Sequence, residues 1–525
     1  MILSNYISGE WQQGKGEGEG IPLIDPVNGE HLAHASSDGL DLAQALEFSR
    51  ERGSRVLQRL TYQHRAELLG KIAEVLSRHR DDYYEICLRN MGATKGDAAF
   101  DVEGAIYTLK HYAKAGQNLE GEMIKDGDPV PLSKSGVFQG QHFLKPLEGV
   151  AVLIDAFNFP AWGLWEKAAP ALLSGVAVFV KPATPTAWLA QRMIEDVIKA
   201  GILPDGALSV LCGSPGDLLD HVTAHDVIAF TGSAATGAKI KTHSAVVSHS
   251  VRVNIEGDSL NSAILGEDAP GTQPFELLVK EALKEMTQKA GQKCTAIRRI
   301  LVPRKTLIPV CDTIASALKA MPVGNPRNAA VKCGPLVNKA QQTAVLDGIA
   351  QLKRECKVIF GGDQGFQPID AESGSSCFVP PTLLRCDDPL RARIVHEVEV
   401  FGPVATVMPY DTVEEVIELG RRGHGSLVAS IYSDDAKFTE EITRGLATTH
   451  GRIMVVDSSV GTQHTGHGNV MPNCLHGGPG RAGGGEELGG LRALELYHRR
   501  FVVQGPPELL NELSQSSVDF AALHG

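Results

Sequence analysis

From Gly149 onward, short apolar runs alternate with stretches long enough to form helices, and this alternation limits the possible folds more than any other feature of the chain. The apolar runs predict strands at 150–154, 177–180, 208–211, 227–230 and 251–255. Two intervening stretches, 162–173 and 187–199, predict helices. Strands and helices that alternate at this spacing form a parallel, doubly wound sheet, which binds ligands beyond the carboxyl ends of its strands.

A second α/β region is predicted from about residue 261 to 454, and a long helical region is predicted at about 41–117. The strand candidates of the second region are 299–302, 357–360 and 404–408. A chain of 525 residues is too long for a single hydrophobic core, so we expect two or three domains.

Composition limits the classes of binding partner and the cellular compartment that we expect. The net charge of −12 argues against nucleic acid and anionic membranes as partners. The longest apolar stretch, 168–180, has only 13 residues and is flanked by Lys167 and Lys181, too short for a membrane span. The N-terminal residues lack a basic stretch followed by a long apolar one, so no signal peptide is expected. Nine scattered cysteines without a Cys-x-x-Cys pair predict a reduced, cytoplasmic chain without a structural metal.

Cys294 and Glu256 are the candidate reactive pair. Cys294 lies in the glycine-containing stretch Lys289-Ala-Gly-Gln-Lys-Cys-Thr295, and Glu256 ends an apolar, strand-like run. A cysteine can act as a nucleophile and a glutamate can activate water, and covalent catalysis followed by hydrolysis needs both. A lone cysteine is more often a small buried hydrophobe, so further motifs are needed. No histidine stands in a recognisable dyad context, which argues against a cysteine hydrolase.

Four short motifs surround this pair. They are Phe157-Asn-Phe-Pro160, Lys181-Pro-Ala-Thr184, Phe230-Thr-Gly-Ser233 followed by Gly237, and Glu399-Val-Phe-Gly-Pro403. Singly, each is typical of a turn or a helix cap. In this order, with Glu256 and Cys294 between the third and the fourth, they resemble the aldehyde dehydrogenase superfamily. The resemblance extends from Tyr6 to about Tyr497.

The resemblance implies an α/β fold with a doubly wound Rossmann-type cofactor domain, a second α/β catalytic domain and a small β element for oligomerisation. We expect the dinucleotide-binding domain at 1–135 and 148–258, and the catalytic domain at 259–470. Segments 136–147 and 490–525 are expected to supply the oligomerisation strands and a C-terminal tail. Residues 501–504 are expected to pair with a partner subunit in a homo-oligomer, with a dimer favoured.

The resemblance also implies the roles of individual residues. Cys294 would attack the aldehyde carbon, Asn158 and the Cys294 backbone N–H would hold the oxyanion, and Glu256 would activate water. The turn at Ser233 suits the cofactor pyrophosphate, and Glu399 would bind the nicotinamide ribose. The expected cofactor-binding residues are Phe157, Lys181, Thr184, Thr231, Gly232, Ser233, Gly237, Gly257, Glu399 and Phe401. No metal is expected.

Several positions depart from the family pattern. Thr184 stands where NAD-preferring members carry a glutamate that would repel a 2′-phosphate, which favours NADP, with NAD used at lower efficiency. Phe157 stands where tryptophan is common. The usual Glu-Leu-Gly-Gly reads Glu256-Gly-Asp-Ser259, which keeps the base and leaves its local turn open.

The glycine-dense segment from His476 to Leu491 replaces the commoner glycine-lysine-serine signature. It resembles two branches of the family that act on CoA-linked semialdehydes in aromatic-acid catabolism. One branch carries a hydratase domain after its dehydrogenase, and since the chain ends at Gly525, we favour the stand-alone branch. Within this segment, Arg481 is open to two interpretations, a phosphate ligand or, more often for such a residue, a surface side chain.

We therefore expect NADP-dependent oxidation of a CoA thioester that carries a terminal aldehyde on a six-carbon acyl chain. One alternative is a broad-specificity enzyme acting on free aldehydes. Another is a CoA-acylating dehydrogenase, against which Glu256 argues because that branch usually lacks a glutamate there. A structural or binding role without catalysis is the least supported, because Asn158, Glu256, Cys294 and Glu399 are all present.

Overall fold

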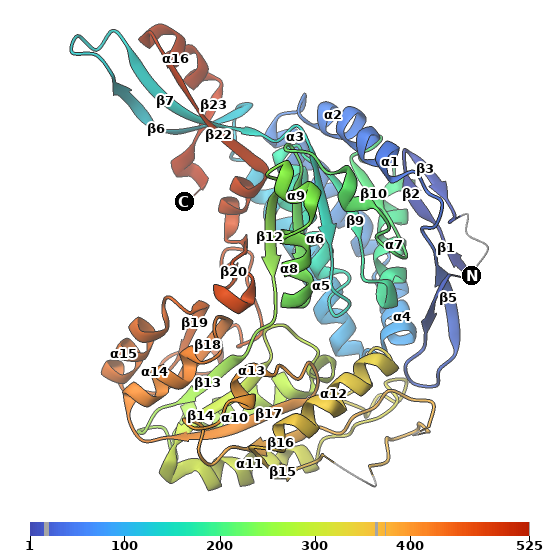
Figure 1. Ribbon diagram of the computed structural model, residues 1–525, viewed down its shortest axis with the longest axis vertical. Helices are drawn as coiled ribbons and strands as arrows, with labels where there is room; N and C mark the ends of the chain where they lie inside the picture. Colours follow the sequence, from blue (N-terminus) through green and yellow to red (C-terminus); the bar gives the residue numbers. More distant parts are fainter. Residues whose placement is uncertain (15–19, 363–365, 373, 524–525) are drawn as a thin grey trace.

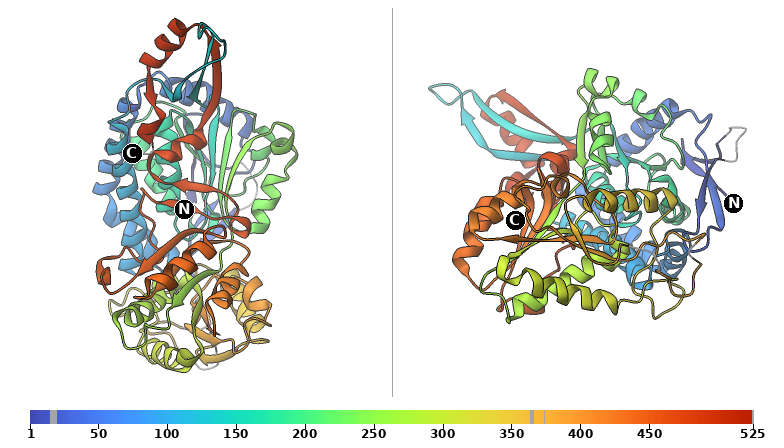
Figure 2. Two further views of the ribbon diagram at one scale, coloured as in Figure 1. Left: turned by 90° about the vertical axis from the view of Figure 1, so that its left-hand side faces the viewer. Right: turned by 60° about the horizontal axis from the view of Figure 1, so that its bottom comes forward.

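The computed structural model describes residues 1–14, 20–362, 366–372 and 374–523. Two α/β bodies lie one above the other, and a slender arm extends beyond the upper one (Figure 1). The upper body contains the first seven-stranded sheet and the lower body contains the second. The left-hand view of Figure 2 shows the same arrangement from the side.

The first sheet has the strand order β12-β11-β8-β9-β10-β2-β3. Its strands are β8 (Val150–Ile154), β9 (Ala177–Lys181), β10 (Leu208–Val210), β11 (Val227–Thr231), β12 (Arg252–Glu256), β2 (Asn5–Ile7) and β3 (Glu10–Gln12). The first five pair in parallel, as predicted, while β2 and β3 add an antiparallel edge. The chain winds outward from β8 in one direction and returns to β11 on its other side, which makes the β8/β11 boundary the topological switch point where such sheets bind ligands.

Apolar strands fix this sheet. The side chains of Val150, Ala151, Val152 and Leu153 are completely buried, as expected when helices cover both faces of a parallel sheet. Helices α6 (Trp162–Ser174) and α7 (Ala187–Lys199) connect its strands, and α8 (Ala234–Lys241) and α9 (Ser244–Ser248) follow β11. The predicted limits of these strands, of α6 and of α7 differ from the structure by one residue at most.

The helical region predicted at 41–117 divides into five helices. They are α1 (Leu42–Phe48), α2 (Arg55–Leu57), α3 (Tyr62–Arg78), α4 (Arg80–Met91) and α5 (Lys95–Gly116). The side chains of Thr61 and Thr94 accept backbone N–H groups at the starts of α3 and α5, and Gly92, with φ of 60°, ends α4. A small sheet of β1 (Ile2–Leu3), β5 (His31–Ala35) and β4 (Ile21–Ile24) lies at the N-terminus.

The second sheet has the order β15-β16-β17-β14-β13-β18-β19, parallel except for β15. Its strands are β13 (Asn261–Leu265), β14 (Ile297–Pro303), β15 (Lys357–Phe360), β16 (Thr382–Arg385), β17 (Val404–Tyr410), β18 (Ser426–Tyr432) and β19 (His450–Val456). Its helices are α10 (Gln273–Thr287), α11 (Leu307–Lys319), α12 (Lys339–Leu352), α13 (Ile394–Glu397), α14 (Val413–Arg421) and α15 (Ala436–Leu446). A short hairpin of β20 (Leu475–Gly477) and β21 (Glu486–Leu488) then returns to the upper body.

The arm is a four-stranded sheet of order β22-β7-β6-β23 with one helix. Its elements are β6 (Met123–Pro131), β7 (Gln139–Pro146), β22 (His498–Gly505), α16 (Pro507–Gln515) and β23 (Ser517–Asp519). Strand β6, which the expected domain limits group with the cofactor-binding part, pairs with β7. The domain limits themselves stay a prediction.

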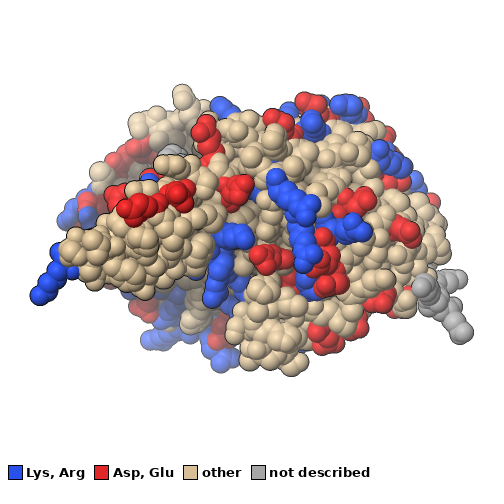
Figure 3. All heavy atoms as spheres, turned by 90° about the horizontal axis from the view of Figure 1, so that it is seen from above, with Lys and Arg blue, Asp and Glu red and all other residues tan. Residues whose placement is uncertain are grey.

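Two further observations concern the surface. On the face seen from above, basic and acidic side chains lie next to one another (Figure 3). In the part of the chain that the structure describes, no helix is both long and apolar enough to cross a membrane.

Candidate active site

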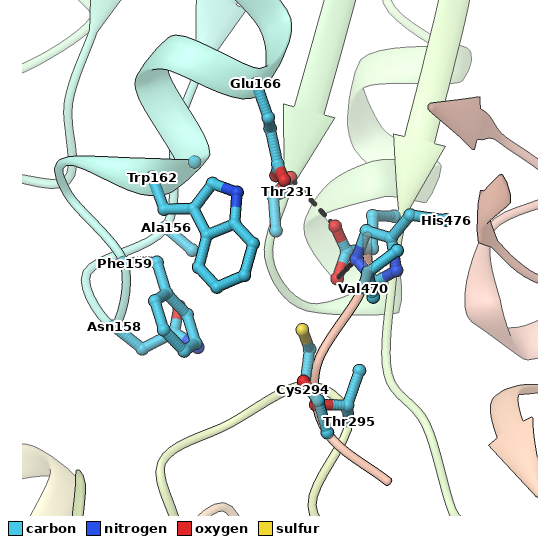
Figure 4. A pocket seen from close by; sticks show the side chains of 13 residues that line it. Ala156, Asn158, Phe159, Trp162, Glu166, Thr231, Cys294, Thr295, Val470 and His476 are labelled. Atoms are coloured by element: carbon cyan, nitrogen blue, oxygen red, sulfur yellow. Dashed lines mark hydrogen bonds and ion pairs between the residues drawn. The ribbon is translucent and has the colours of Figure 1, made fainter. Parts of the chain in front are cut away.

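The candidate site lies where the carboxyl ends of the first sheet face the second body. Asn158 follows β8, Ser233 follows β11, and Glu256 is the last residue of β12. Cys294 comes from the other body, in the turn between α10 and β14. In Figure 4, Glu166, His476 and Cys294 point toward the same space from different parts of the fold. Segments far apart in the sequence therefore build one site.

The turn that carries Cys294 is fixed by its backbone. Residues 289–291 have left-handed φ values of 52°, 53° and 69°. A Cβ at Gly291 would lie 2.2 Å from the carbonyl oxygen of Gly402. Glycine at this position therefore allows the backbone segments around Gly291 and Gly402 to lie in contact. The buried guanidinium of Arg298 donates to the carbonyl oxygens of Gly291 at 2.9 Å and Gly402 at 2.7 Å. These contacts hold the thiol in one place.

Two cavities meet at the thiol. The smaller encloses about 510 Å³ and is lined by Phe159, Trp162, Glu166 and Glu256, among others. The larger encloses about 1090 Å³ and is lined by Phe157, Ser233, Glu399 and Arg481, among others. Asn158, Thr231 and Cys294 line both cavities. A substrate carbonyl in the smaller cavity and a dinucleotide in the larger would therefore approach Cys294 from opposite sides.

Glu256 is buried and paired with a cation. Its Oε1 lies 3.1 Å from Nε2 of His476, and Thr231 donates to its Oε2 at 3.4 Å. Burial by itself would raise the pKa of the Glu256 carboxyl, but the His476 imidazolium outweighs it and lowers the pKa to about 2. Burial would lower the pKa of His476, but the Glu256 carboxylate outweighs it and raises that pKa to about 9. At neutral pH the two groups form an ion pair.

The charges around Cys294 disfavour its thiolate. Burial raises the pKa of the thiol well above its usual range, and the carboxylates of Glu256, Glu166 and Glu399 raise it further. The Sγ atom lies within 4.8 Å of a carboxylate oxygen of Glu256 and of a ring nitrogen of His476, a spacing that a metal ion could also bridge. The resting cysteine is thus a neutral thiol with a carboxylate base beside it.

A buried charge cluster continues inward from Glu256. The ammonium of Lys167, almost completely buried, lies 3.2 Å from a carboxylate oxygen of Glu166 and 3.2 Å from one of Glu487. Burial raises the pKa of Glu166 to about 7, although Lys167 opposes the shift. Carboxylate oxygens of Glu166, Glu256 and Glu487 lie within 4.8 Å of one another. The sequence analysis did not identify Glu166, Lys167 or Glu487 as residues of the site.

Most of the expected cofactor residues line the larger cavity. They are Phe157, Thr231, Gly232, Ser233, Gly257, Glu399 and Phe401. At the start of α8 the Ser233 side chain accepts the backbone N–H of Thr236 at 3.2 Å and Asp258 accepts that of Ala234 at 2.9 Å, and Ser233, Thr236 and Asp258 all line the cavity. The rings of Phe157 and Phe401 meet edge to face at 5.7 Å.

Glu399 has one carboxylate oxygen available for a ligand. Its Oε2 accepts the backbone N–H of Ser259 at 3.2 Å, while its buried Oε1 accepts no hydrogen bond from any described residue. Burial raises the pKa of Glu399 to about 7, with Arg298 opposing the shift. The Oε1 atom faces Arg298 Nε at 3.8 Å but accepts no hydrogen bond from the described residues, which leaves an acceptor for the ribose hydroxyls of a dinucleotide in this cavity.

Three of the expected cofactor residues are not in the lining of this cavity. The buried ammonium of Lys181 donates to the carbonyl oxygen of Pro182 at 2.7 Å, and the hydroxyl of Thr184 donates to that of Gly213 at 3.0 Å. Ala183, between them, does line the cavity. Gly237 lies on the buried face of α8, where a Cβ would lie 2.8 Å from the Ile255 side chain, so it serves packing of the helix on β12.

The structure corrects two interpretations, one of the histidines and one of Arg481. His476 lies beside Glu256 and Cys294, so the absence of a suitably placed histidine was a wrong reason for excluding a cysteine hydrolase. The surface interpretation of Arg481 was also wrong, because its side chain is 17% exposed and lines the larger cavity, 3.5 Å from Asp258. The glycines allow backbone packing: a Cβ at Gly483 or Gly485 would lie within 2.4 Å of the Ile255 carbonyl oxygen.

Comparison with known proteins agrees with this geometry. Residues 11–499 match the model of the aldehyde dehydrogenase family. The chain is 60% identical, over 91% of its length and 93% of the relative's, to a protein of Aromatoleum evansii named 3,4-dehydroadipyl-CoA semialdehyde dehydrogenase. Betaine aldehyde dehydrogenase of Staphylococcus aureus superposes with a TM-score of 0.82 at 24% identity, covering 96% of this chain and 95% of that one. The structure of 3,6-anhydro-L-galactose dehydrogenase, solved in complex with NADP, superposes with a TM-score of 0.83 at 25% identity, covering 96% of this chain and 100% of that one. The resemblance and the α/β fold expected from the sequence are confirmed.

Proposed function

The chain belongs to the aldehyde dehydrogenase family, and we propose that it oxidises 3,4-dehydroadipyl-CoA semialdehyde to the carboxylic acid, with NADP as the hydride acceptor. The observation that carries this substrate is the 60% identity, over nearly the full length of both chains, with the Aromatoleum evansii protein named for it. The site supports the reaction class, because a thiol, a carboxylate base and an amide converge between two cavities.

Acylation begins with the Cys294 thiol. Its S–H bond breaks, the proton goes to Glu256, and sulfur bonds to the aldehyde carbon to give a thiohemiacetal. The Asn158 side-chain amide, which lines both cavities, is placed to stabilise the oxyanion. The larger cavity would hold NADP, which would supply the hydride acceptor, so that the carbonyl re-forms as a thioester on Cys294.

Deacylation needs water and a base. After acylation, Glu256 releases the thiol proton to solvent, and its carboxylate, ionised at neutral pH beside His476, then takes a proton from water as the water oxygen attacks the thioester carbon. The bond from that carbon to the sulfur of Cys294 then breaks, the thiolate takes the proton back from Glu256, and the acid is released. The same carboxylate thus serves both half-reactions, and this argues against free CoA as the acceptor in place of water.

The proposed preference for NADP rests on the charge that is absent at Thr184. Because its hydroxyl hydrogen is engaged by Gly213, Thr184 supports NADP by lacking a carboxylate and not by donating to a 2′-phosphate. Arg481 adds a cation to the cavity, and the pyrophosphate of either cofactor would meet it near the start of α8. NAD is expected to be used at lower efficiency.

The deciding experiment is a comparison of kcat/KM for the CoA-linked semialdehyde and for a free medium-chain aldehyde, each with NADP and NAD. A much higher value for the CoA-linked substrate is expected, because remote contacts with CoA contribute to transition-state binding. Equal values would remove the CoA claim and favour a broad-specificity enzyme. Release of an acyl-CoA product that requires added CoA would instead favour the acylating branch.

A matched pair of cysteine variants tests the covalent step. Cys294→Ala should abolish turnover while leaving NADP binding intact, because the alanine has no nucleophile. Cys474, the exposed cysteine, is the control, and Cys474→Ala should keep most of the activity. Turnover by Cys294→Ala above a few per cent of wild type would contradict the mechanism.

We also propose a cytoplasmic homodimer. All nine cysteines are free, which suits a reducing compartment. β22 lies at the edge of the arm's sheet, with Phe501 and Val502 about two-fifths exposed, so a partner strand can pair with it. Light scattering coupled to size-exclusion chromatography should give twice the chain mass, and Val502→Pro should shift the mass toward the monomer.

A further inference from the structure

A histidine is held against the carboxylate that serves as the base. β20 carries His476, and its pairing with β21 sets His476 opposite Glu487 in the hairpin. The imidazole is 6% exposed, lines the smaller cavity and reaches Glu256 Oε1 at 3.1 Å. Its ring nitrogen also lies within 4.8 Å of the Cys294 sulfur. The ring therefore contacts one partner of the first proton transfer and lies near the other.

We propose that His476 is a positioning residue whose imidazolium is the shared counter-charge of the Glu256 carboxylate and the Cys294 thiolate. This rests on the proposed function, in which these two groups are base and nucleophile. Before the reaction, the imidazolium balances the ionised Glu256. When the S–H proton has moved to Glu256, the imidazolium keeps its own proton and balances the thiolate instead. The total charge of the three groups stays constant while one anion replaces the other.

The surrounding charges make this cation necessary. Glu166, from α6, and Glu487, from β21, approach the pair, and Glu399 adds a further carboxylate that disfavours the thiolate. The other cations near the pair have partners of their own: Lys167 lies 3.2 Å from both Glu166 and Glu487, Arg298 lies 3.8 Å from Glu399, and Arg452 donates to the His467 carbonyl oxygen at 2.8 Å. His476 is the cation in direct contact with Glu256. Without it, a thiolate would form beside an uncompensated carboxylate, which costs free energy in a buried site.

Alkylation of Cys294 by iodoacetamide tests the proposal without aldehyde or cofactor. EDTA is included, because the three groups are spaced to hold a metal ion. Peptide mass spectrometry gives the rate at Cys294, and the exposed Cys474 in the same digest is the internal reference. His476→Gln keeps a hydrogen-bond donor and removes the charge. At pH 8 it should slow alkylation of Cys294 about tenfold, as one pKa unit of the thiol changes the thiolate fraction tenfold.

Two comparisons separate this effect from a structural one. His450→Gln alters another buried histidine, whose ring lies 3.1 Å from the Thr449 hydroxyl, and should leave the rate at Cys294 within about twofold of wild type. In a Glu256→Gln background, His476 loses the carboxylate that keeps it charged. There, His476→Gln should change the rate less than about twofold.

Three results would overturn the proposal. One is an unchanged alkylation rate in His476→Gln with normal unfolding temperature. Another is an equal loss in the Glu256→Gln background, which would show a structural role. The third needs no histidine variant: in wild type the rate should rise less steeply as pH passes about 9, where His476 loses its proton, and a profile without this inflection refutes the counter-charge. None of these three results changes the expected loss of turnover in Cys294→Ala, so the proposed function is tested separately.

Discussion

Gly291→Ala tests whether backbone contact positions the nucleophile. The φ of +69° at this position costs an L-residue about 1–2 kcal/mol. The added Cβ would lie 2.2 Å from the Gly402 carbonyl oxygen, whereas Cβ contacts under 3.0 Å are essentially never seen. The backbone segments around Gly291 and Gly402 must therefore separate by about 0.8 Å, the difference between these two distances. With about 1–3 kcal/mol for overpacking, we expect the free energy of unfolding to fall by about 2–5 kcal/mol.

This separation displaces residues of the site whichever of the two segments moves. The Gly291 side carries Cys294, and the Gly402 side carries Glu399 and Phe401 in the cofactor cavity. A misplacement near 1 Å costs about 10²-fold in rate, so kcat for aldehyde oxidation should fall by roughly that factor. Gly127→Ala is the matched control, because φ there is +72° but no atom lies within 4 Å of the added Cβ.

Both variants are assayed by NADPH formation at saturating substrate and by their apparent unfolding temperature. Gly127→Ala should keep wild-type kcat and unfold slightly earlier, from backbone strain alone. Gly291→Ala should unfold earlier still and lose most of its activity. If the two variants lose the same stability and the same activity, contact with Gly402 does not position Cys294 and the reasoning is refuted.

Three further predictions concern single residues. Glu256→Gln should slow both the NADPH burst and the steady-state rate in stopped-flow absorbance, because Glu256 takes a proton first from the thiol and then from water; a burst at the wild-type rate followed by slow turnover would limit Glu256 to deacylation. Wild type should show a higher kcat/KM for NADP than for NAD, and Thr184→Glu should erase or reverse the ratio; an unchanged ratio contradicts the role of Thr184. Glu399 is charged only above its raised pKa of about 7, so KM for the cofactor should increase as pH falls through 7. Glu399→Gln should have a higher KM that no longer varies with pH, and a wild-type KM independent of pH would contradict the ribose role.

Local pattern was sufficient for the first sheet. Strand β8 and helix α7 have the predicted limits, because a buried parallel strand is a continuous apolar run and α7 has one apolar face along its length. Residues that end such strands meet at one edge of the sheet, which is why Asn158, Ser233 and Glu256 were identified from the sequence. The arm was harder, because β23 pairs in parallel with β6 from the far end of the chain, a contact without a local signal.

The residues that were missed are those whose role depends on long-range contact. Glu166 and Lys167 occupy adjacent positions of a helix that is otherwise almost entirely buried, where the sequence alone shows only two charges in an apolar stretch. Their partner Glu487 is more than 300 residues away in the chain. A charge inside a predicted buried helix is itself a usable signal, since such a charge needs a partner or a function.

The departures from the family pattern are informative when they are considered in pairs. One departure is Glu256-Gly-Asp-Ser259, and the other is the glycine-dense segment that begins at His476. In the structure these two stretches meet. Asp258 lies 3.5 Å from Arg481, Glu256 lies 3.1 Å from His476, and a Cβ at Gly257 would lie 2.8 Å from the Arg481 carbonyl oxygen. The second stretch thus supplies a cation for each carboxylate of the first and needs glycine where the backbones touch. For the Asp258–Arg481 pair, replacing one stretch alone by the common family sequence would leave one charge without its partner, whereas replacing both together would remove the two charges at once.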